Sequence, residues 1–128
     1  LLSPFYKPAK DHWRAEDFPE QIAAIAAGSY KEKSPPAIKG SGFVVDSLEA
    51  ALWAFYHSED YRHCCLLAAN LGDDADTTAA IYGQLAGAYY GEAGIPPAWL
   101  EKLALRELIE EYATRLYELG WKANLPAA

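Results

Sequence analysis

The chain has 128 residues, of which 52% are hydrophobic, so it can build one hydrophobic core and is too apolar to be intrinsically disordered. Acidic residues number 18 and basic residues 11, which gives a net charge of −7. This charge argues against a non-specific nucleic-acid-binding protein, because such proteins need clustered Lys and Arg. We therefore expect no nucleic-acid partner.

Other features of the composition concern origin and compartment. The sequence opens at Leu1 and contains no Met, so we expect an excerpt or a processed product of a longer protein. No apolar run approaches the roughly 20 residues of a membrane span, and no signal peptide opens the chain, so we expect no membrane partner. The two cysteines, Cys64 and Cys65, are neighbours and cannot form an ordinary structural disulfide, which favours a reduced, cytoplasmic protein.

Amino-acid usage predicts an all-α fold. Ala and Leu together number 39, whereas Val and Ile together number 8. Ala and Leu lose little conformational freedom in a helix, while β-branched residues favour strands. With no internal repeat, residues 1–128 are interpreted as a single segment.

An irregular lead-in over residues 1–16 precedes the first predicted helix. Asp17 is a candidate cap for that helix, and Gly28 is its predicted end. A loop over residues 31–42 follows, and it closes on Gly40-Ser41-Gly42.

The second predicted helix begins at a candidate capping box, in which Glu49 returns a hydrogen bond to a cap at Asp46. Behind it lies an apolar stripe at helical spacing: Leu48, Ala51, Leu52 and Phe55. Ser58-Glu59-Asp60 opens a third helix, which we expect to end near Gly72.

A fourth helix is predicted to begin within residues 73–77 and to end at Tyr90. Gly83, Gly87 and Gly91 recur along it every four residues. Each Gly costs up to roughly 1 kcal/mol in a helix interior, so this stripe predicts unusually close backbone packing.

Residues 94–97 are read as a hard stop, after which a last helix is predicted. Its apolar residues are expected to face inward: Leu105, Leu108, Ile109, Tyr112, Leu116 and Leu119. Arg106–Glu110 and Glu111–Arg115 would form i,i+4 ion pairs outside, and residues 120–128 form a short tail.

Candidate chemistry is concentrated in Asn70-Leu71-Gly72-Asp73-Asp74-Ala75-Asp76-Thr77-Thr78, which leads into the fourth helix. One interpretation is ordinary helix capping, with Asp73 as the cap and Asp76 at the third helical position. The other is a site for a hard cation, in which Asp74, Asp76 and Thr77 supply oxygen ligands to Mg²⁺. These three residues make a partial ligand shell, and the spacing excludes an EF-hand.

The motif Asn70 to Thr77, the helix Ala79 to Gly91, and Ile95-Pro96-Pro97-Ala98-Trp99 together resemble the ADP-ribosylglycohydrolase family. Upstream, Gly40-Ser41-Gly42-Phe43-Val44-Val45 and Leu48 to Phe55 are similar to the segment that precedes this motif in the family. The resemblance covers roughly residues 18 to 119 in order. It implies an orthogonal all-α helical domain that holds two Mg²⁺ ions in a cleft, with Mn²⁺ as a possible substitute.

The same resemblance assigns roles to single residues. The family motif Asp-x-Asp-Thr falls on Asp74, Asp76 and Thr77 as metal ligands. Gly42 and Phe43 fall in the segment expected to contact ADP-ribose, although Tyr is frequent where this chain has Phe43, and plain core packing is the alternative for this ring. A second departure is Asp73, where many relatives carry Gly.

A further half-site of the family, an N-terminal Thr-Asp-Asp with a separate Glu, has no match in this sequence. The resemblance therefore implies the C-terminal portion of an ADP-ribosyl hydrolase, acting on a modified protein or small molecule. We expect no catalytic residue in this chain and no turnover without an N-terminal half of the same domain or a second chain. Two alternatives are a non-catalytic helical binding module and a chain that associates through an exposed apolar seam.

The remaining candidates have simpler interpretations. His12, His57 and His63 show no metal-like spacing with the cysteines, so they are expected to be partly exposed or satisfied in the core. Cys64 and Cys65 stand beside leucines on a predicted helix, which favours buried packing.

Overall fold

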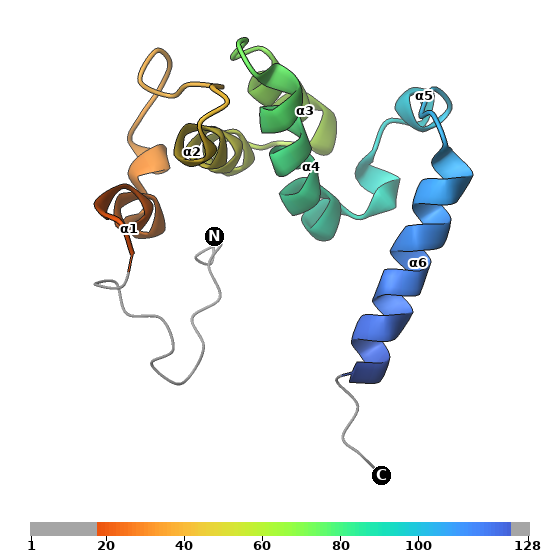
Figure 1. Ribbon diagram of the computed structural model, residues 1–128. Helices are drawn as coiled ribbons and strands as arrows, with labels where there is room; N and C mark the ends of the chain where they lie inside the picture. The colour runs from red at the N-terminus through yellow and green to blue at the C-terminus, as the bar shows by residue number, and fades with distance from the viewer. Residues whose placement is uncertain (1–17, 124–128) are drawn as a thin grey trace. The chain divides into compact units, whose positions relative to one another are not determined.

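The regular elements of the chain are all helical over residues 18–123, the range that the computed structural model describes. In order along the chain they are α1 (Glu20–Ala27), the 3₁₀ helix η2 (Ser29–Lys31), α2 (Val44–Tyr56), α3 (Tyr61–Ala69), α4 (Ala75–Tyr90), the 3₁₀ helix η3 (Glu92–Gly94), α5 (Pro97–Leu100) and α6 (Arg106–Ala123) (Figure 1). The predicted all-α class is confirmed. The predicted lead-in at 1–16 and the cap at Asp17 lie outside the described range.

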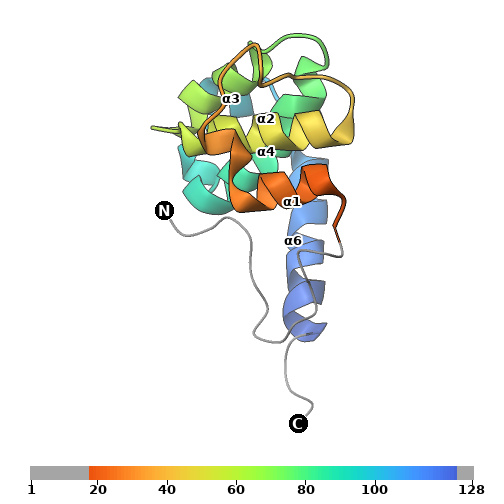
Figure 2. The same ribbon diagram turned by 90° about the vertical axis from the view of Figure 1, so that its left-hand side faces the viewer.

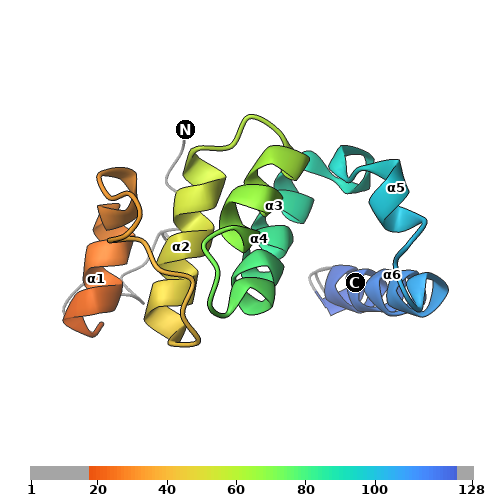
Figure 3. The same cartoon turned by 90° about the horizontal axis from the view of Figure 1, so that it is seen from above.

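The chain divides into two units at Gly94, and α2 is the central helix of the first. Viewed from above, α2 lies between α1 and the pair formed by α3 and α4 (Figure 3). From the side of α1, α2 is seen above that helix (Figure 2). Residues 50–54 of α2 are all buried, as expected for a helix with neighbours around it.

The core of this unit is built largely from small side chains of α2, α3 and α4, with aromatic and aliphatic residues filling between them. Its buried hydrophobic members are Ile25, Tyr30, Ile38, Ala50, Ala51, Leu52, Trp53, Ala54, Cys64, Ala68, Tyr82 and Ala86. The predicted stripe of the second helix is confirmed, because Ala51 and Leu52 are buried while Leu48 and Phe55 pack partly buried against them.

The predicted capping box of α2 is wrong. The helix begins at Val44, so Asp46 lies inside its first turn instead of at the cap. The Asp46 carboxylate accepts a hydrogen bond from the Ser41 hydroxyl at 2.7 Å, and Glu49 is held by residues of the preceding segment. Tertiary partners in the loop therefore take both acids away from the helix terminus.

The start of α3 confirms its prediction. Asp60 occupies the N-cap, and its side chain accepts a hydrogen bond from the His63 backbone N–H at 2.6 Å. The helix ends at Ala69, three residues before the expected Gly72, which has a φ of 75° in the turn that follows.

Helix α4 packs against α3 through Tyr82, which is fully buried. The Tyr82 hydroxyl donates a hydrogen bond to the Tyr61 carbonyl at 3.1 Å. Burial raises the pKa of this phenol well above its ordinary value, so the side chain stays neutral and acts as a core donor.

The close packing expected along the glycine stripe of α4 is wrong for the described residues. A Cβ added at Gly87 would meet no atom within 4 Å, and one at Gly83 would lie 3.5 Å from the Tyr61 hydroxyl. Gly91 has a φ of 70° and ends the helix, so its role is conformational.

Helix α4 runs from Ala75 to Tyr90, which confirms its predicted beginning within residues 73–77 and its predicted end. The stop expected at residues 94–97 is only partly correct, because the chain forms η3 and α5 around it, two short helices that the sequence did not predict. Pro97 starts α5, where its missing N–H and fixed φ are tolerated.

Helix α6 corrects a second expectation about the last unit. The apolar residues expected to face inward are exposed: Leu105, Leu108, Ile109, Tyr112, Leu116 and Leu119. Their amphipathic spacing is real, but no described element of residues 95–123 covers them. The ion pairs Arg106–Glu110 and Glu111–Arg115 are both present, and the helix continues to Ala123, past the tail predicted from residue 120. Of the helices described, none has both the length and the apolar character needed to cross a membrane.

The capping interaction of α3 predicts that Asp60→Ala lowers the free energy of unfolding by about 1 kcal/mol, because the His63 amide loses its acceptor. Urea unfolding followed by circular dichroism measures this change. Glu59→Ala is the matched control, since it removes the neighbouring exposed carboxylate and should change stability by less than about 0.5 kcal/mol. Equal losses in the two variants would contradict the capping role.

Candidate functional site

A tight turn brings the loop before α2 against the start of α4. Gly72 and Asp73 have φ values of 75° and 52°, so two consecutive residues take left-handed conformations. The turn directs the Asp74 backbone N–H to the Gly40 carbonyl, at 2.8 Å. Residues more than thirty positions apart in the sequence are thereby joined at one point.

The capping interpretation of the acidic cluster is wrong in its residues. The N-cap of α4 is Asp74 and not Asp73, and its side chain makes no hydrogen bond to a backbone N–H of the helix. Asp76 is therefore the second helical residue and not the third. The Asp74 carboxylate accepts instead from the Thr77 hydroxyl at 3.0 Å, so two of the predicted ligands are in direct contact.

Gly42 lies beside this carboxylate. A Cβ added at Gly42 would stand 3.2 Å from Asp74 Oδ2, closer than most such contacts. The missing side chain leaves that oxygen uncovered on the side of the loop. The structure thus brings together one residue predicted to contact substrate and one predicted to bind metal.

Phe43 presents its ring to solvent, with 52% of its surface exposed. The core-packing alternative for Phe43 is therefore wrong within the described part of the chain. Its backbone N–H donates to the Ser41 hydroxyl at 3.3 Å, and that hydroxyl in turn donates to Asp46. The loop is consequently pinned immediately before the exposed ring.

Thr78 is a structural member of the site that the sequence reasoning did not single out. It is fully buried, and its hydroxyl donates to the Asp74 carbonyl at 3.1 Å. A Cβ added at Gly40 would meet the Gly72 carbonyl at 2.9 Å and the Thr78 hydroxyl at 3.4 Å. A Thr four residues after a helix cap was the available signal, since its hydroxyl can return to that carbonyl.

A depression of about 490 Å³ adjoins the turn. It shares Gly40, Ser41 and Asp73 with the site and is otherwise mainly apolar, lined by Pro35, Pro36, Ile38, Lys39, Trp53, Leu67, Asn70 and Leu71. Loop and helices therefore leave a concave surface next to the acidic turn.

The turn concentrates negatively charged side chains. Asp73, Asp74 and Asp76 lie within four positions, and in residues 18–123 no ion pair involves any of them. Within the same range, no three carboxylate, imidazole or thiol side chains gather closely enough to enclose a metal ion. Hard oxygen donors with no cationic partner fit the chemistry of Mg²⁺, but they amount to a partial shell.

The histidines and cysteines are engaged elsewhere. His57 Nδ1 lies 2.9 Å from the Trp53 carbonyl, and His63 Nδ1 lies 3.7 Å from the Cys64 sulfur. Cys64 is buried as expected, and burial, followed by the neighbouring Cys64, raises the pKa of the Cys65 thiol. A thiol with a raised pKa is a poor nucleophile at neutral pH. His12 lies outside the described residues.

The fold agrees with comparisons to known proteins. A model of the ADP-ribosylglycohydrolase family matches residues 4–125, and the chain therefore belongs to this family. A solved structure described as an ADP-ribosylglycohydrolase-related protein complex superposes with a TM-score of 0.76 at 44% identity, covering 82% of this chain and 36% of that one.

Curated relatives carry consistent names. The chain is 54% identical over 94 residues to ADP-ribosylarginine hydrolase Tri1 of Pseudomonas putida, covering 73% of this chain and 25% of that protein. It is 50% identical over 102 residues to Tri1 of Serratia proteamaculans, covering 80% and 28% respectively. ADP-ribosyl-[dinitrogen reductase] glycohydrolase of Rhodospirillum rubrum is 38% identical over 68 residues, covering 53% and 23%. The chain thus spans about a quarter of the length of these relatives.

The close approach at Gly40 predicts that Gly40→Ala lowers the free energy of unfolding by about 1–3 kcal/mol, because the new methyl group meets the Gly72 carbonyl. Gly87→Ala makes the same chemical change where there is open space inside α4, and should raise stability by up to about 1 kcal/mol. Urea unfolding of both variants measures the difference. If Gly40→Ala is as stable as the parent chain, the turn is not tightly packed at this point.

Proposed function

We propose that this chain contributes Asp74, Asp76 and Thr77 to the metal site of an ADP-ribosyl hydrolase. The observation that carries the proposal is the geometry of Asp74, whose carboxylate contacts Thr77, faces Gly42 and makes no capping hydrogen bond. A carboxylate that merely began a helix would accept from the backbone N–H groups of its first turn. This one is positioned for another partner.

Each residue has a distinct task in this proposal. Asp74 and Asp76 would supply negative oxygen ligands and Thr77 a neutral one, a set suited to Mg²⁺ and also to Mn²⁺. When bound, the ions would supply Lewis-acid stabilisation of negative charge on the substrate. Gly42 keeps the loop close to the carboxylate without covering it, and the exposed ring of Phe43 offers an apolar surface for ADP-ribose.

The substrate that we propose is ADP-ribosylated arginine. Two relatives with 50% identity or more are named as ADP-ribosylarginine hydrolases, and their similarity covers most of this chain. Three ligands cannot complete a site for two ions, so we propose that an N-terminal portion of the domain or a second chain supplies the remainder. No residue of the present chain is assigned as the catalytic acid or base.

The metal assignment can be tested on this chain with Mn²⁺, whose paramagnetism broadens the NMR signals of nearby amides even when binding is weak. We expect substoichiometric Mn²⁺ to broaden the amide signals of residues 73–78 and 40–43. The double variant Asp74→Asn/Asp76→Asn should abolish this broadening because it removes both charged ligands.

Glu107→Gln is the matched control for that experiment, since it removes an exposed carboxylate from α6 and should leave the broadening unchanged. Broadening spread evenly over all acidic segments, or retained in the double variant, would remove the metal assignment. A non-catalytic binding module would then be the better interpretation.

The proposed substrate contact predicts that Phe43→Ala weakens ADP-ribose binding by about tenfold, because an exposed aromatic face for stacking is lost. Isothermal titration in the presence of Mg²⁺ measures the affinity. Val44→Ala truncates the next residue, which is also exposed, and should change the affinity by less than about twofold. Equal effects of the two truncations would argue against a specific role for the ring.

A further inference from the structure

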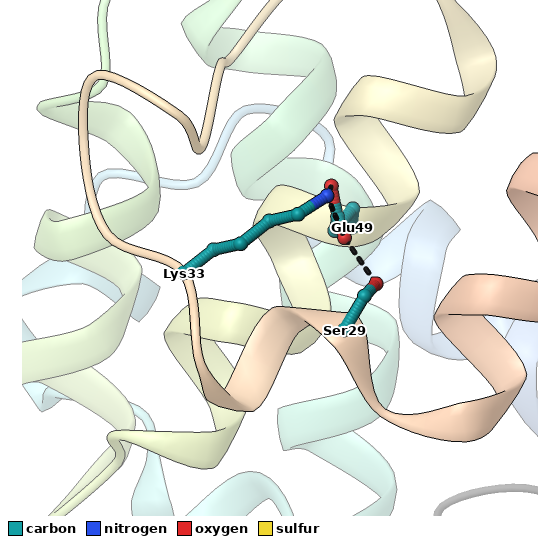
Figure 4. Close-up of polar contacts among 3 residues, drawn as sticks. All are labelled: Ser29, Lys33 and Glu49. Atoms are coloured by element: carbon teal, nitrogen blue, oxygen red, sulfur yellow. Dashed lines mark hydrogen bonds and ion pairs between the residues drawn. The ribbon is translucent and has the colours of Figure 1, made fainter.

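A buried carboxylate holds the segment that precedes the site. Glu49 lies in the middle of α2 with only 8% of its surface exposed. Its carboxylate accepts a hydrogen bond from the Ser29 hydroxyl and two from the Lys33 ammonium, at 2.8 and 2.9 Å. Both side chains point to this one acid in Figure 4.

Packing alone does not explain an acid at this position. Burying a charged group is unfavourable unless it is paired, and an apolar residue of similar size would fill the same space. In some proteins a buried polar group fixes one arrangement among several. The arrangement selected here is that of residues 29–33, because the contacts of Glu49 reach both ends of that segment.

Residues 29–33, which the hydrogen bonds of Glu49 hold at both ends and which we call the clamped segment, precede the site in the sequence. From Lys33 the chain runs through a loop whose next anchor is the buried side chain of Ile38, and then reaches Gly40. Among the described residues, one backbone–backbone hydrogen bond involves residues 39–42. In it the Gly40 carbonyl accepts from the Asp74 N–H. In the sequence, Gly40 therefore lies between the segment that Glu49 holds and the acidic turn that its carbonyl contacts.

We propose that Glu49 is a positioning residue, which through Lys33 and the loop sets the Gly40 carbonyl that holds the Asp74 backbone. The role of the positioned site rests on the proposed function, whereas the link from Glu49 to Asp74 can be measured without it. The carboxylate of Glu49 bonds to Ser29 and Lys33, and no described hydrogen bond or ion pair joins it to the acidic turn, so it would act through the loop.

The link is measured by NMR on the isotope-labelled full chain. The scalar coupling across the hydrogen bond from Asp74 N–H to the Gly40 carbonyl reports that contact directly in folded molecules, and the Asp74 amide shift reports its geometry. We expect Glu49→Gln and Lys33→Met to abolish the coupling and move the shift. Lys33→Arg, which keeps a cation with several N–H donors, should retain both.

Glu32→Gln is the matched control, because it removes an exposed carboxylate from the same segment and should leave the coupling intact. Should Glu49→Gln fail to fold, Lys33→Met decides the question, since it alters a side chain that is 42% exposed. An unchanged Asp74 coupling in the folded variants would overturn the proposal.

A second measurement connects the clamp to ligand binding. With Mg²⁺ present, we expect Glu49→Gln to weaken ADP-ribose binding at least about tenfold and Glu32→Gln to leave it unchanged. If the parent chain binds no ADP-ribose, the proposed contact of this chain with ADP-ribose fails, while the Asp74 coupling still decides the positioning role. If the parent binds and Glu49→Gln binds equally well, Glu49 does not position the site.

Discussion

The complete burial of the middle of α2 is the constraint on which the first unit depends. Residues 50–54 are enclosed by α1, η2, α3 and α4 together, and three of these five residues are Ala. Short side chains let neighbouring helices approach closely from several directions. Helices α2 and α4, at whose beginnings the proposed site lies, contact each other in this packing.

Local sequence signals predicted the longer helices well, because helix propensity and capping depend on residues that are close together in the sequence. The cap at Asp60 depends on one side chain and an amide three residues away, and the composition alone favours helix throughout. The start of α2 could not be predicted in the same way. Asp46 and Glu49 have the spacing of a capping box, yet both are engaged by residues of the preceding segment, and no local pattern reports such partners.

In the candidate site, too, local features could be predicted from the sequence and tertiary contacts could not. Asp74, Asp76 and Thr77 could be found from their spacing and from the family resemblance, and the contact between Asp74 and Thr77 spans only three positions. The approach of Gly42 to Asp74 depends on a loop and two intervening helices, so it required the structure. The amphipathic pattern of α6 was also read correctly, but a pattern shows which face is apolar and not which surface covers it.

The left-handed backbone at Asp73 bears on how this position can vary during evolution. Its φ of 52° is freely available to Gly and tolerated by Asp and Asn, but strained for β-branched and bulky residues. Where this chain has Asp73, the family resemblance places Gly in many relatives. The torsion angle at this position would permit an exchange between Asp and Gly. Substitutions at residue 73 would accordingly be limited by the backbone conformation of the turn, whereas substitutions at Asp74 would change the proposed ligand.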